Sequence, residues 1–211
     1  MDHDQKKQKK VINDSPDAAE EGDAWIYTAV KRGSYLFPVF SIGKWTQDTC
    51  RSMIYDFRRR LSFNSQLKAE VFTDGNDDYT YAFRGFFPQG MINYGQLVKI
   101  RDSRGKLIGK ERRIIYGNPD EDDIDTINVE NFNGILRERV GRLVRKTKCF
   151  SKKKYRLIYA VSLFQFYWNF MSEIRRGRSP AMLESLSENL WTWHDFFYAE
   201  LTHLTYDTTQ N

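Results

Sequence analysis

The sequence predicts an α/β layered domain with a helical C-terminal flank. Short runs of aromatic and β-branched residues, which favour strands, alternate with longer segments whose apolar residues recur at helical spacing. The last third of the chain carries helical patterns only. With 211 residues, of which 40% are hydrophobic, the chain is long enough and apolar enough to bury the core of one sizeable domain.

Changes in composition divide the chain into three parts. Residues 1–22 are polar and mixed in charge, which is typical of a tail or linker. Residues 23–175 hold the alternating strand and helix patterns and form the predicted core. Residues 176–211 begin within the helix-breaking sequence RRGRSP and form the predicted C-terminal helical extension.

The composition excludes several classes of protein. No stretch approaches the roughly 20 uninterrupted apolar residues of a membrane span, so we expect no membrane partner. The first residues lack the apolar segment of a secretory signal. Cys50 and Cys149 are isolated, which favours the reducing cytoplasm, and they do not combine with the scattered histidines into a zinc site.

The predicted core opens with a β-hairpin. Residues 24–30 and 35–42 favour strands and are separated by the turn sequence KRGS. Pro38 lacks an amide donor, so the second strand is expected at an edge or a bulge. Thr46 is a predicted N-cap for an amphipathic helix. The next predicted elements are a strand over residues 69–73, a helix over 78–87 and a strand over 92–100.

The remaining segments are more ambiguous. The charged residues 101–113 are either a loop or an exposed hairpin, and the acidic residues 117–125 lead into a helix that contains Glu130. A helix over 155–174 is apolar nearly all round, which predicts burial. An aromatic helix over 190–201 closes the chain, and its aromatic side chains are interpreted as core, not as a base-stacking platform: Trp191, Trp193, Phe196 and Phe197.

Cationic residues concentrate between Arg137 and Arg156. Ten Lys and Arg residues against the single acid Glu138 give this segment a net charge of +9, in a protein whose total is +5. A charge that concentrated indicates a polyanion as partner, and nucleic acid is the usual one. The sequence therefore predicts DNA contacts that are made largely to phosphates.

Glu130 is a candidate catalytic carboxylate at the start of this helix. At about 100° per residue, one stripe of the predicted helix carries Glu130, Gly134, Arg137 and Gly141. Apolar residues between Val129 and Val144 lie on another face and would pack on the sheet. A glycine inside a helix costs about 1 kcal/mol relative to alanine, which favours a stripe that a phosphate backbone approaches closely at a metal site. An exposed Glu–Arg surface stripe is the alternative.

Asp74 is the second candidate carboxylate. It lies where a strand ends, and ligands gather at the carboxyl ends of strands in α/β sheets. The sequence Asp-Gly is also ordinary turn chemistry, so this alternative stays open. A strand carboxylate and a helix carboxylate suit two-metal phosphoryl transfer, although such sites need further acidic ligands. The acidic run between Asp120 and Asp125 does not have calcium-loop spacing and is interpreted as a solvated loop.

The basic segment resembles a known family signature. VENFNGILRERVGRLVRKTKCFSKK resembles the glutamate helix of DDE transposases of the insertion-sequence-one group, in which a glutamate and an asparagine precede arginine-rich turns and an RxTxxFSK motif. FTDGNDDY resembles the second-aspartate strand, with Asp74 as that aspartate and Tyr79 as the tyrosine that follows it. The resemblance covers roughly Gly22 to Trp193.

The resemblance implies a ribonuclease-H-like mixed sheet flanked by helices, and metal-dependent cleavage and transfer of DNA strands. Asp74 and Glu130 would be catalytic residues and ligands of Mg²⁺ or Mn²⁺. Transposon ends and target DNA would be the partners, a homo-oligomer stays open, and the expected location is cytoplasmic and nucleoid-associated. The implied DNA-binding residues are Asn133, Arg137, Arg142, Arg145, Lys146, Lys148 and Lys152.

One departure from the family concerns its first aspartate, which lies in a DE-x-W-like strand before a stretch resembling QKKQKK. Here only Asp2 and Asp4 precede that stretch, and no apolar strand carries either. We therefore expect a truncated transposase that lacks its first core strand and one ligand and is inactive alone, with Asp23 as a weaker substitute. A non-catalytic DNA-binding remnant is the alternative. A generic ribonuclease-H-like nuclease would explain the carboxylates but not RKTKCFSK.

Overall fold

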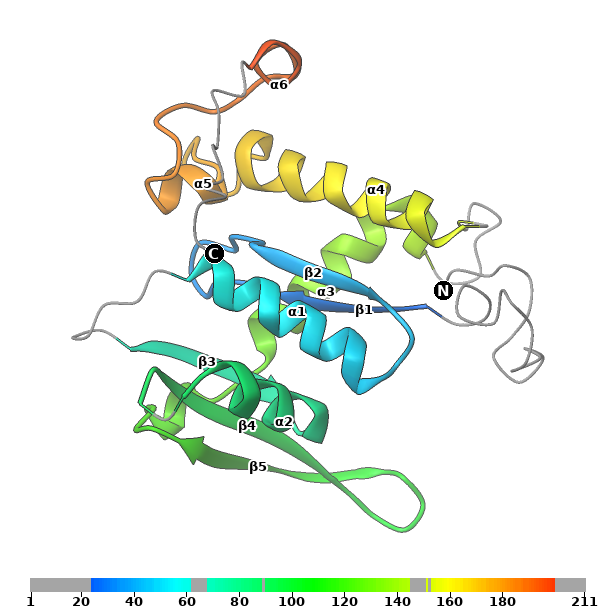
Figure 1. Ribbon diagram of the computed structural model, residues 1–211, viewed down its shortest axis with the longest axis vertical. Helices are drawn as coiled ribbons and strands as arrows, with labels where there is room; N and C mark the ends of the chain where they lie inside the picture. Colours follow the sequence, from blue (N-terminus) through cyan, green and yellow to red (C-terminus); the bar gives the residue numbers. More distant parts are fainter. Residues whose placement is uncertain (1–23, 62–67, 89, 145–150, 152, 200–211) are drawn as a thin grey trace, which may run out of the picture.

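The computed structural model describes residues 24–61, 68–88, 90–144, 151 and 153–199 (Figure 1). The described part is a mixed α/β structure, as the sequence predicts. Its regular elements are β1 (Trp25–Ala29), β2 (Val39–Gly43), α1 (Gln47–Arg60), β3 (Ala69–Asp74), α2 (Asp77–Phe86), β4 (Ile92–Arg101), β5 (Leu107–Tyr116), η2 (Glu121–Asp123), α3 (Ile127–Arg139), η3 (Gly141–Leu143), α4 (Lys154–Phe166), η4 (Tyr167–Met171), α5 (Pro180–Leu183) and α6 (Trp193–Tyr198).

The predicted first hairpin is confirmed. β1 and β2 pair antiparallel, with Trp25 opposite Gly43 and Ala29 opposite Val39. Pro38 immediately precedes β2, where its missing amide removes no bond of this ladder. Asn169 bonds both backbone groups of Phe37, accepting from its N–H at 2.9 Å and donating to its carbonyl at 2.8 Å.

The second sheet has three strands and mixed direction. β3 runs parallel to β4, from Ala69 opposite Ile92 to Asp74 opposite Leu97, and β4 runs antiparallel to β5. The charged segment 101–113 is therefore an exposed hairpin, one of its two predicted forms. Asp102 closes its turn, because its Oδ1 accepts the N–H groups of Arg104 and Lys106 at 2.9 and 2.8 Å.

The two sheets share one layer between helices. Alternation along β1 and β2 turns Tyr27 and Val39 toward α1, whereas Ile26 and Ile42 face α3 and α4. Tyr94 on β4 joins the same cluster as Tyr27, together with residues of α1 and α2. Figure 1 accordingly shows α1 in front of the strands and α3 behind them.

The layer is interrupted between β1 and β3. Down the view of Figure 1 the strands follow in the order β2, β1, β3, β4, β5, yet β1 pairs with β2 alone and β3 with β4 alone within the described residues. Side chains bridge the interruption. The Arg32 guanidinium lies 5.5 Å from the ring centre of Phe72, and the rings of Tyr27 and Tyr79 lie 5.9 Å apart.

Three expectations about the helices are corrected. The Glu130 helix ends at Arg139, so Gly141 belongs to the separate turn η3 and not to the predicted stripe. The α4 helix is not buried all round, because Tyr159 is 68% exposed and Leu163 is also exposed. In the C-terminal flank, the exposed aromatic side chains are Trp193, Phe197 and Tyr198, so the core interpretation was wrong for the first two of them.

No helix in the described part of the chain is long and apolar enough to cross a membrane.

Gly95 fixes the distance between β4 and the segment that leads into α3. A Cβ added at Gly95 would lie 2.6 Å from Cδ1 of the fully buried Ile124. We expect Gly95→Ala to lower the free energy of unfolding by about 1–3 kcal/mol through overpacking. Urea unfolding measures this cost, which should shrink in an Ile124→Val background, where Cδ1 is gone.

Gly134→Ala is the matched control, because nothing lies within 4 Å of its added Cβ. It should raise stability by about 1 kcal/mol, since alanine is the better helix former. Equal effects of the two substitutions would contradict this packing account.

Candidate carboxylate site and cationic surface

Asp74 is the last residue of β3, and its side chain is exposed. Its Oδ1 accepts the backbone N–H of Asn76 at 3.2 Å, which is the turn bond that Asp-Gly sequences favour. Asn76 in turn caps α2 by accepting the N–H of Asp78 at 3.1 Å. The turn role of Asp74 is therefore real, and it uses one carboxylate oxygen while the group stays open to solvent.

Glu130 lies in the first turn of α3, where the helix dipole favours a negative charge. Its Oε1 accepts Lys99 Nζ at 2.6 Å and the Thr126 hydroxyl at 3.0 Å. The hydrogen bond from Lys99 is the main cause that lowers the pKa of Glu130 below its usual value. The lowered pKa favours the ionised carboxylate, and the two hydrogen bonds hold it in place. Because the side chain is 52% exposed, the carboxylate is also accessible to solvent.

The sheet register relates the two carboxylates. Asp74 pairs with Leu97, and Lys99 lies two residues further along β4. The Cα atoms of Asp74 and Lys99 are therefore diagonal neighbours at roughly 7–8 Å. Asp74 shares the sheet face of Phe72, and that is the face that packs on Ile124 and α3. Lys99 projects from the same face and bonds Glu130. Lys99 therefore links Glu130 to the end of β4 that lies beside Asp74, whereas the charge of Asp74 acts on Cys50 and Tyr79 in the cluster under α1 and α2.

Neighbouring titratable groups stay neutral. Burial raises the pKa of the Cys50 thiol to about 12, and the charges of Asp78 and Asp74 act in the same direction. Burial also raises the pKa of Tyr27 and of Tyr94 to about 12. Since the reactive form of cysteine is the thiolate, Cys50 is no candidate nucleophile near neutral pH.

The predicted DNA-binding residues have different surroundings. Arg137 is exposed on the Glu130 stripe of α3. Asn133 accepts a hydrogen bond from the Thr28 hydroxyl at 2.9 Å, so its carbonyl oxygen links α3 to β1. Arg142 donates to the buried Ser151 hydroxyl at 3.1 Å. The other four predicted residues lie outside the described part: Arg145, Lys146, Lys148 and Lys152.

The surface around the stripe is open. A Cβ added at Gly134 or at Gly141 meets no described atom within 4 Å, apart from its chain neighbours and its own helix backbone. Packing among the described residues therefore does not require glycine at either position. The approach of a ligand to α3 remains one reason for Gly134, whereas Gly141 lies beyond the helix.

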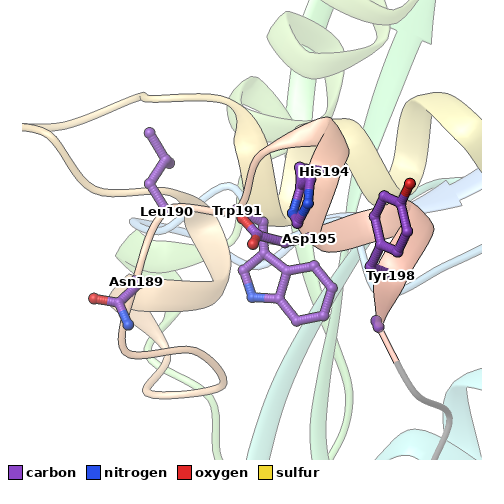
Figure 2. Close-up of a pocket in the computed structure, with 7 residues that line it drawn as sticks. Asn189, Leu190, Trp191, His194, Asp195 and Tyr198 are labelled. Atoms are coloured by element: carbon purple, nitrogen blue, oxygen red, sulfur yellow. The ribbon is translucent and has the colours of Figure 1, made fainter.

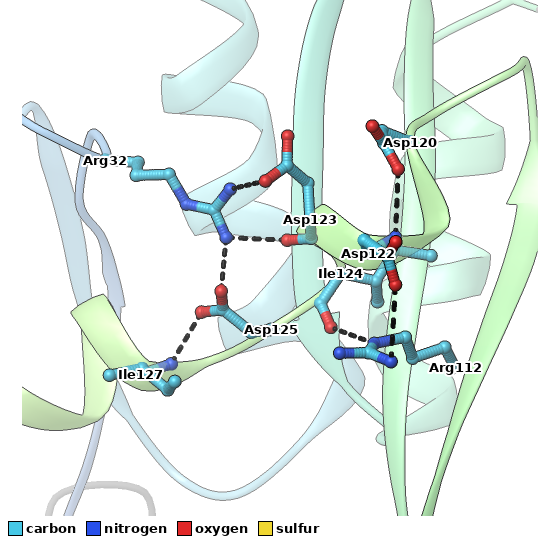
Figure 3. A network of polar contacts seen from close by, with 8 residues as sticks. All are labelled: Arg32, Arg112, Asp120, Asp122, Asp123, Ile124, Asp125 and Ile127. Carbon is cyan, nitrogen blue, oxygen red and sulfur yellow. Dashed lines mark hydrogen bonds and ion pairs between the residues drawn. The ribbon is translucent and has the colours of Figure 1, made fainter.

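The acidic segment before α3 is exposed but tethered, which the solvated-loop interpretation missed. Figure 3 shows Arg32, from the β1–β2 connection, bonding the carboxylate and the carbonyl of Asp123 at 2.7 and 2.6 Å and also the carboxylate of Asp125. Asp125 accepts the N–H of Ile127 at 2.9 Å, and Arg112 donates to the Ile124 carbonyl at 3.3 Å. These bonds fix where α3 begins, and so where Glu130 lies.

Sequence reasoning missed three residues that shape the site: Lys99, Thr126 and Arg32. The spacing of Thr126 and Glu130, four residues apart at a helix start, was a readable signal. Lys99 depends on the β3–β4 register and Arg32 on a contact across about 90 positions. Neither leaves a local pattern.

A pocket of about 440 Å³ lies elsewhere, on the C-terminal flank beside Trp191, His194 and Tyr198 (Figure 2). The carboxylate of Asp195 is already used, because it accepts the backbone N–H and the hydroxyl of Thr192 at 2.7 Å each. The pocket borders Ala199, where the described residues end. It adds nothing to the carboxylate site.

In the described residues, no three His, Cys, Asp or Glu side chains form a group that could hold a metal ion. Comparisons with models of protein families, with curated proteins and with solved structures find no match.

Replacing Lys99 by Met removes the ammonium that lowers the pKa of Glu130, so this pKa should rise toward its usual value. Because the folded-state pKa lies below the unfolded one, the pair stabilises the fold above the unfolded pKa, and this contribution is lost as the pH falls through the folded-state pKa. Both side chains are at least 36% exposed, so the contribution is at most about 1 kcal/mol.

Titration of the Glu130 carboxyl carbon by NMR measures the shift. Lys106→Met on the same hairpin is the control and should leave the pKa of Glu130 nearly unchanged. An unshifted pKa in the Lys99→Met variant would show that Lys99 does not hold this carboxylate in solution.

Proposed function

We propose that this chain is the ribonuclease-H-like, DNA-handling core of a DDE-type transposase. One observation carries the proposal: Asp74 ends β3, and Glu130 begins α3 and is bonded by Lys99 of the neighbouring strand β4, beside exposed cations. Carboxylates from two such elements, next to a surface that attracts phosphates, suit chemistry on a phosphodiester backbone.

The interrupted layer supports the same proposal. Figure 1 shows β1 and β3 side by side, with α1 on one side and α3 on the other, and no described strand pairs with the edges that face one another. Open strand edges are a liability that proteins normally cover. The ribonuclease-H-like sheet that the sequence resemblance implies has its central first strand at this position.

Asp74 and Glu130 are the residues that would hold Mg²⁺ or Mn²⁺, which when bound supplies Lewis-acid stabilisation of the phosphoryl charge. They fit such an ion only in part. Two carboxylates fall short of the usual ligand set, and Lys99 already neutralises one of them. The described residues alone are therefore expected to bind the metal weakly and not to cut DNA.

The second candidate is a non-catalytic DNA-binding remnant of a transposase. The Lys99–Glu130 ion pair favours it, because a carboxylate neutralised within the protein no longer needs a metal. Both candidates require binding to DNA through phosphates, and for both we propose a location with DNA in the cytoplasm. They differ in whether a metal binds at Asp74 and Glu130.

Binding of Mn²⁺ distinguishes the two candidates. We expect weak binding, reduced at least about tenfold by Asp74→Asn and by Glu130→Gln, because each removes a ligand. Lys99→Met should strengthen binding, since the ammonium no longer competes for Glu130. Relaxation of water protons by bound Mn²⁺ measures the affinity.

Glu138→Gln is the matched control, since Glu138 is an exposed carboxylate on the same helix but about two turns further along. It should bind Mn²⁺ like the unchanged protein. Equal Mn²⁺ binding by all four variants would end the metal assignment. Binding of duplex DNA without any binding of Mn²⁺ would establish the remnant.

A further inference from the structure

The β4–β5 hairpin extends beyond the rest of its sheet. β3 pairs with β4 only as far as Leu97, so among the described strands residues 98–101 of β4 pair with β5 alone. Between Lys99 and Ile114 nearly every side chain is exposed, on both faces of the ribbon. Figure 1 shows the hairpin projecting past α2, with no described element over its tip. The exposed half of the hairpin does not pack in the core, so burial of apolar side chains does not explain its length.

The hairpin carries a charge that it does not neutralise. Residues 99–113 hold seven Lys and Arg against two acids, a net charge of +5. Both acids are used locally: Asp102 closes the turn, and Glu111 pairs with Arg113 at 2.6 Å. Among the described residues, the side chains of Lys106 and Lys110 make no hydrogen bond or ion pair.

Two of these cations stand directly opposite one another. Lys99 and Lys110 are paired across the antiparallel ladder, so both project from the face that looks toward α3. Like charges in this position destabilise a sheet. Glu130 accepts a hydrogen bond from Lys99, and the charge of Lys110 also lowers the pKa of Glu130. A single carboxylate does not neutralise both ammonium groups. An anionic ligand on this face would.

The hairpin and α3 enclose the carboxylates between cations. Glu130 has Lys99 and Lys110 on its hairpin side, and Arg137 follows it on the same stripe of α3. We propose that the β4–β5 hairpin is a second DNA-binding element. It would bind the phosphate backbone of a duplex on one side of Glu130, while Arg137 of α3 binds it on the other side. This inference rests on the proposed function, because it assumes that the ligand of α3 is DNA.

The shape of the hairpin favours duplex DNA over an anionic membrane. A two-stranded ribbon with both faces exposed has the dimensions that a major groove admits. The exposed apolar side chains are divided between the faces, since Ile100 lies opposite Gly109 on one face and Ile114 opposite Gly95 on the other. A membrane-binding ribbon would gather them on a single face.

Fluorescence anisotropy with a DNA duplex of about 20 base pairs, measured over a range of salt concentrations, tests the proposal on the full chain. The double variant Lys106→Gln, Lys110→Gln removes two cations that have no partner among the described residues, so the fold should persist. We expect weaker binding and a salt dependence whose slope falls by about 1.8, or about 0.9 for each lost phosphate contact. The matched control, Arg59→Gln with Arg60→Gln, removes the same charge from the end of α1 and should leave the slope unchanged.

The outcomes separate this inference from the proposed function. An unchanged slope in the hairpin variant, with a reduced slope in Arg137→Gln, would overturn the hairpin proposal and leave the proposed function intact. If the unchanged protein does not bind the duplex, both fail. Binding to phosphatidylserine vesicles that only the hairpin variant loses, with DNA binding unaltered, would make the hairpin a membrane contact and also overturn the proposal.

Discussion

The described fold depends on side chains that join two sheets without a backbone hydrogen bond between them. Tyr27 from β1 and Tyr94 from β4 enter one buried cluster under α1 and α2, which holds both sheets in one layer. On the other face, Arg32 lies over Phe72 and bonds the segment that leads into α3. Apolar burial is strong but not directional, whereas the guanidinium of Arg32 fixes orientation. Together they set where α3 starts relative to β3, and therefore where Glu130 stands relative to Asp74.

Much of this fold is readable from local sequence. The β1–β2 hairpin, α1 after its N-cap Thr46, and the strand ending at Asp74 all follow from period and turn residues. The end of α3 was misjudged, because the apolar pattern continues through Val140 and Leu143 while the backbone turns at Gly141. Both apolar residues still pack in the core, so the apolar pattern predicted their burial correctly but not their secondary structure.

The site was less predictable than the fold. Asp74 and Glu130 were selected by their positions at element ends, and the structure brings both to one end of the layer. Lys99 was not selected, because its role arises from the register between β3 and β4, which no local pattern encodes. The exposure of Trp193 and Phe197 also depends on which elements pack against α6, so aromatic content alone gave the wrong answer.

Lys99 links the two proposals, since it is both a cation of the hairpin and the partner of Glu130. An ammonium that turns toward a DNA phosphate releases the carboxylate, and a cation bound by the carboxylate releases the ammonium. Binding of DNA at the hairpin and binding of metal at Glu130 should therefore favour one another, by the same factor in each direction. A remnant that has lost its metal would keep the Lys99–Glu130 pair, and its DNA affinity would be insensitive to Mn²⁺. The exposure of both side chains makes such an exchange inexpensive, because neither group has to leave a buried position.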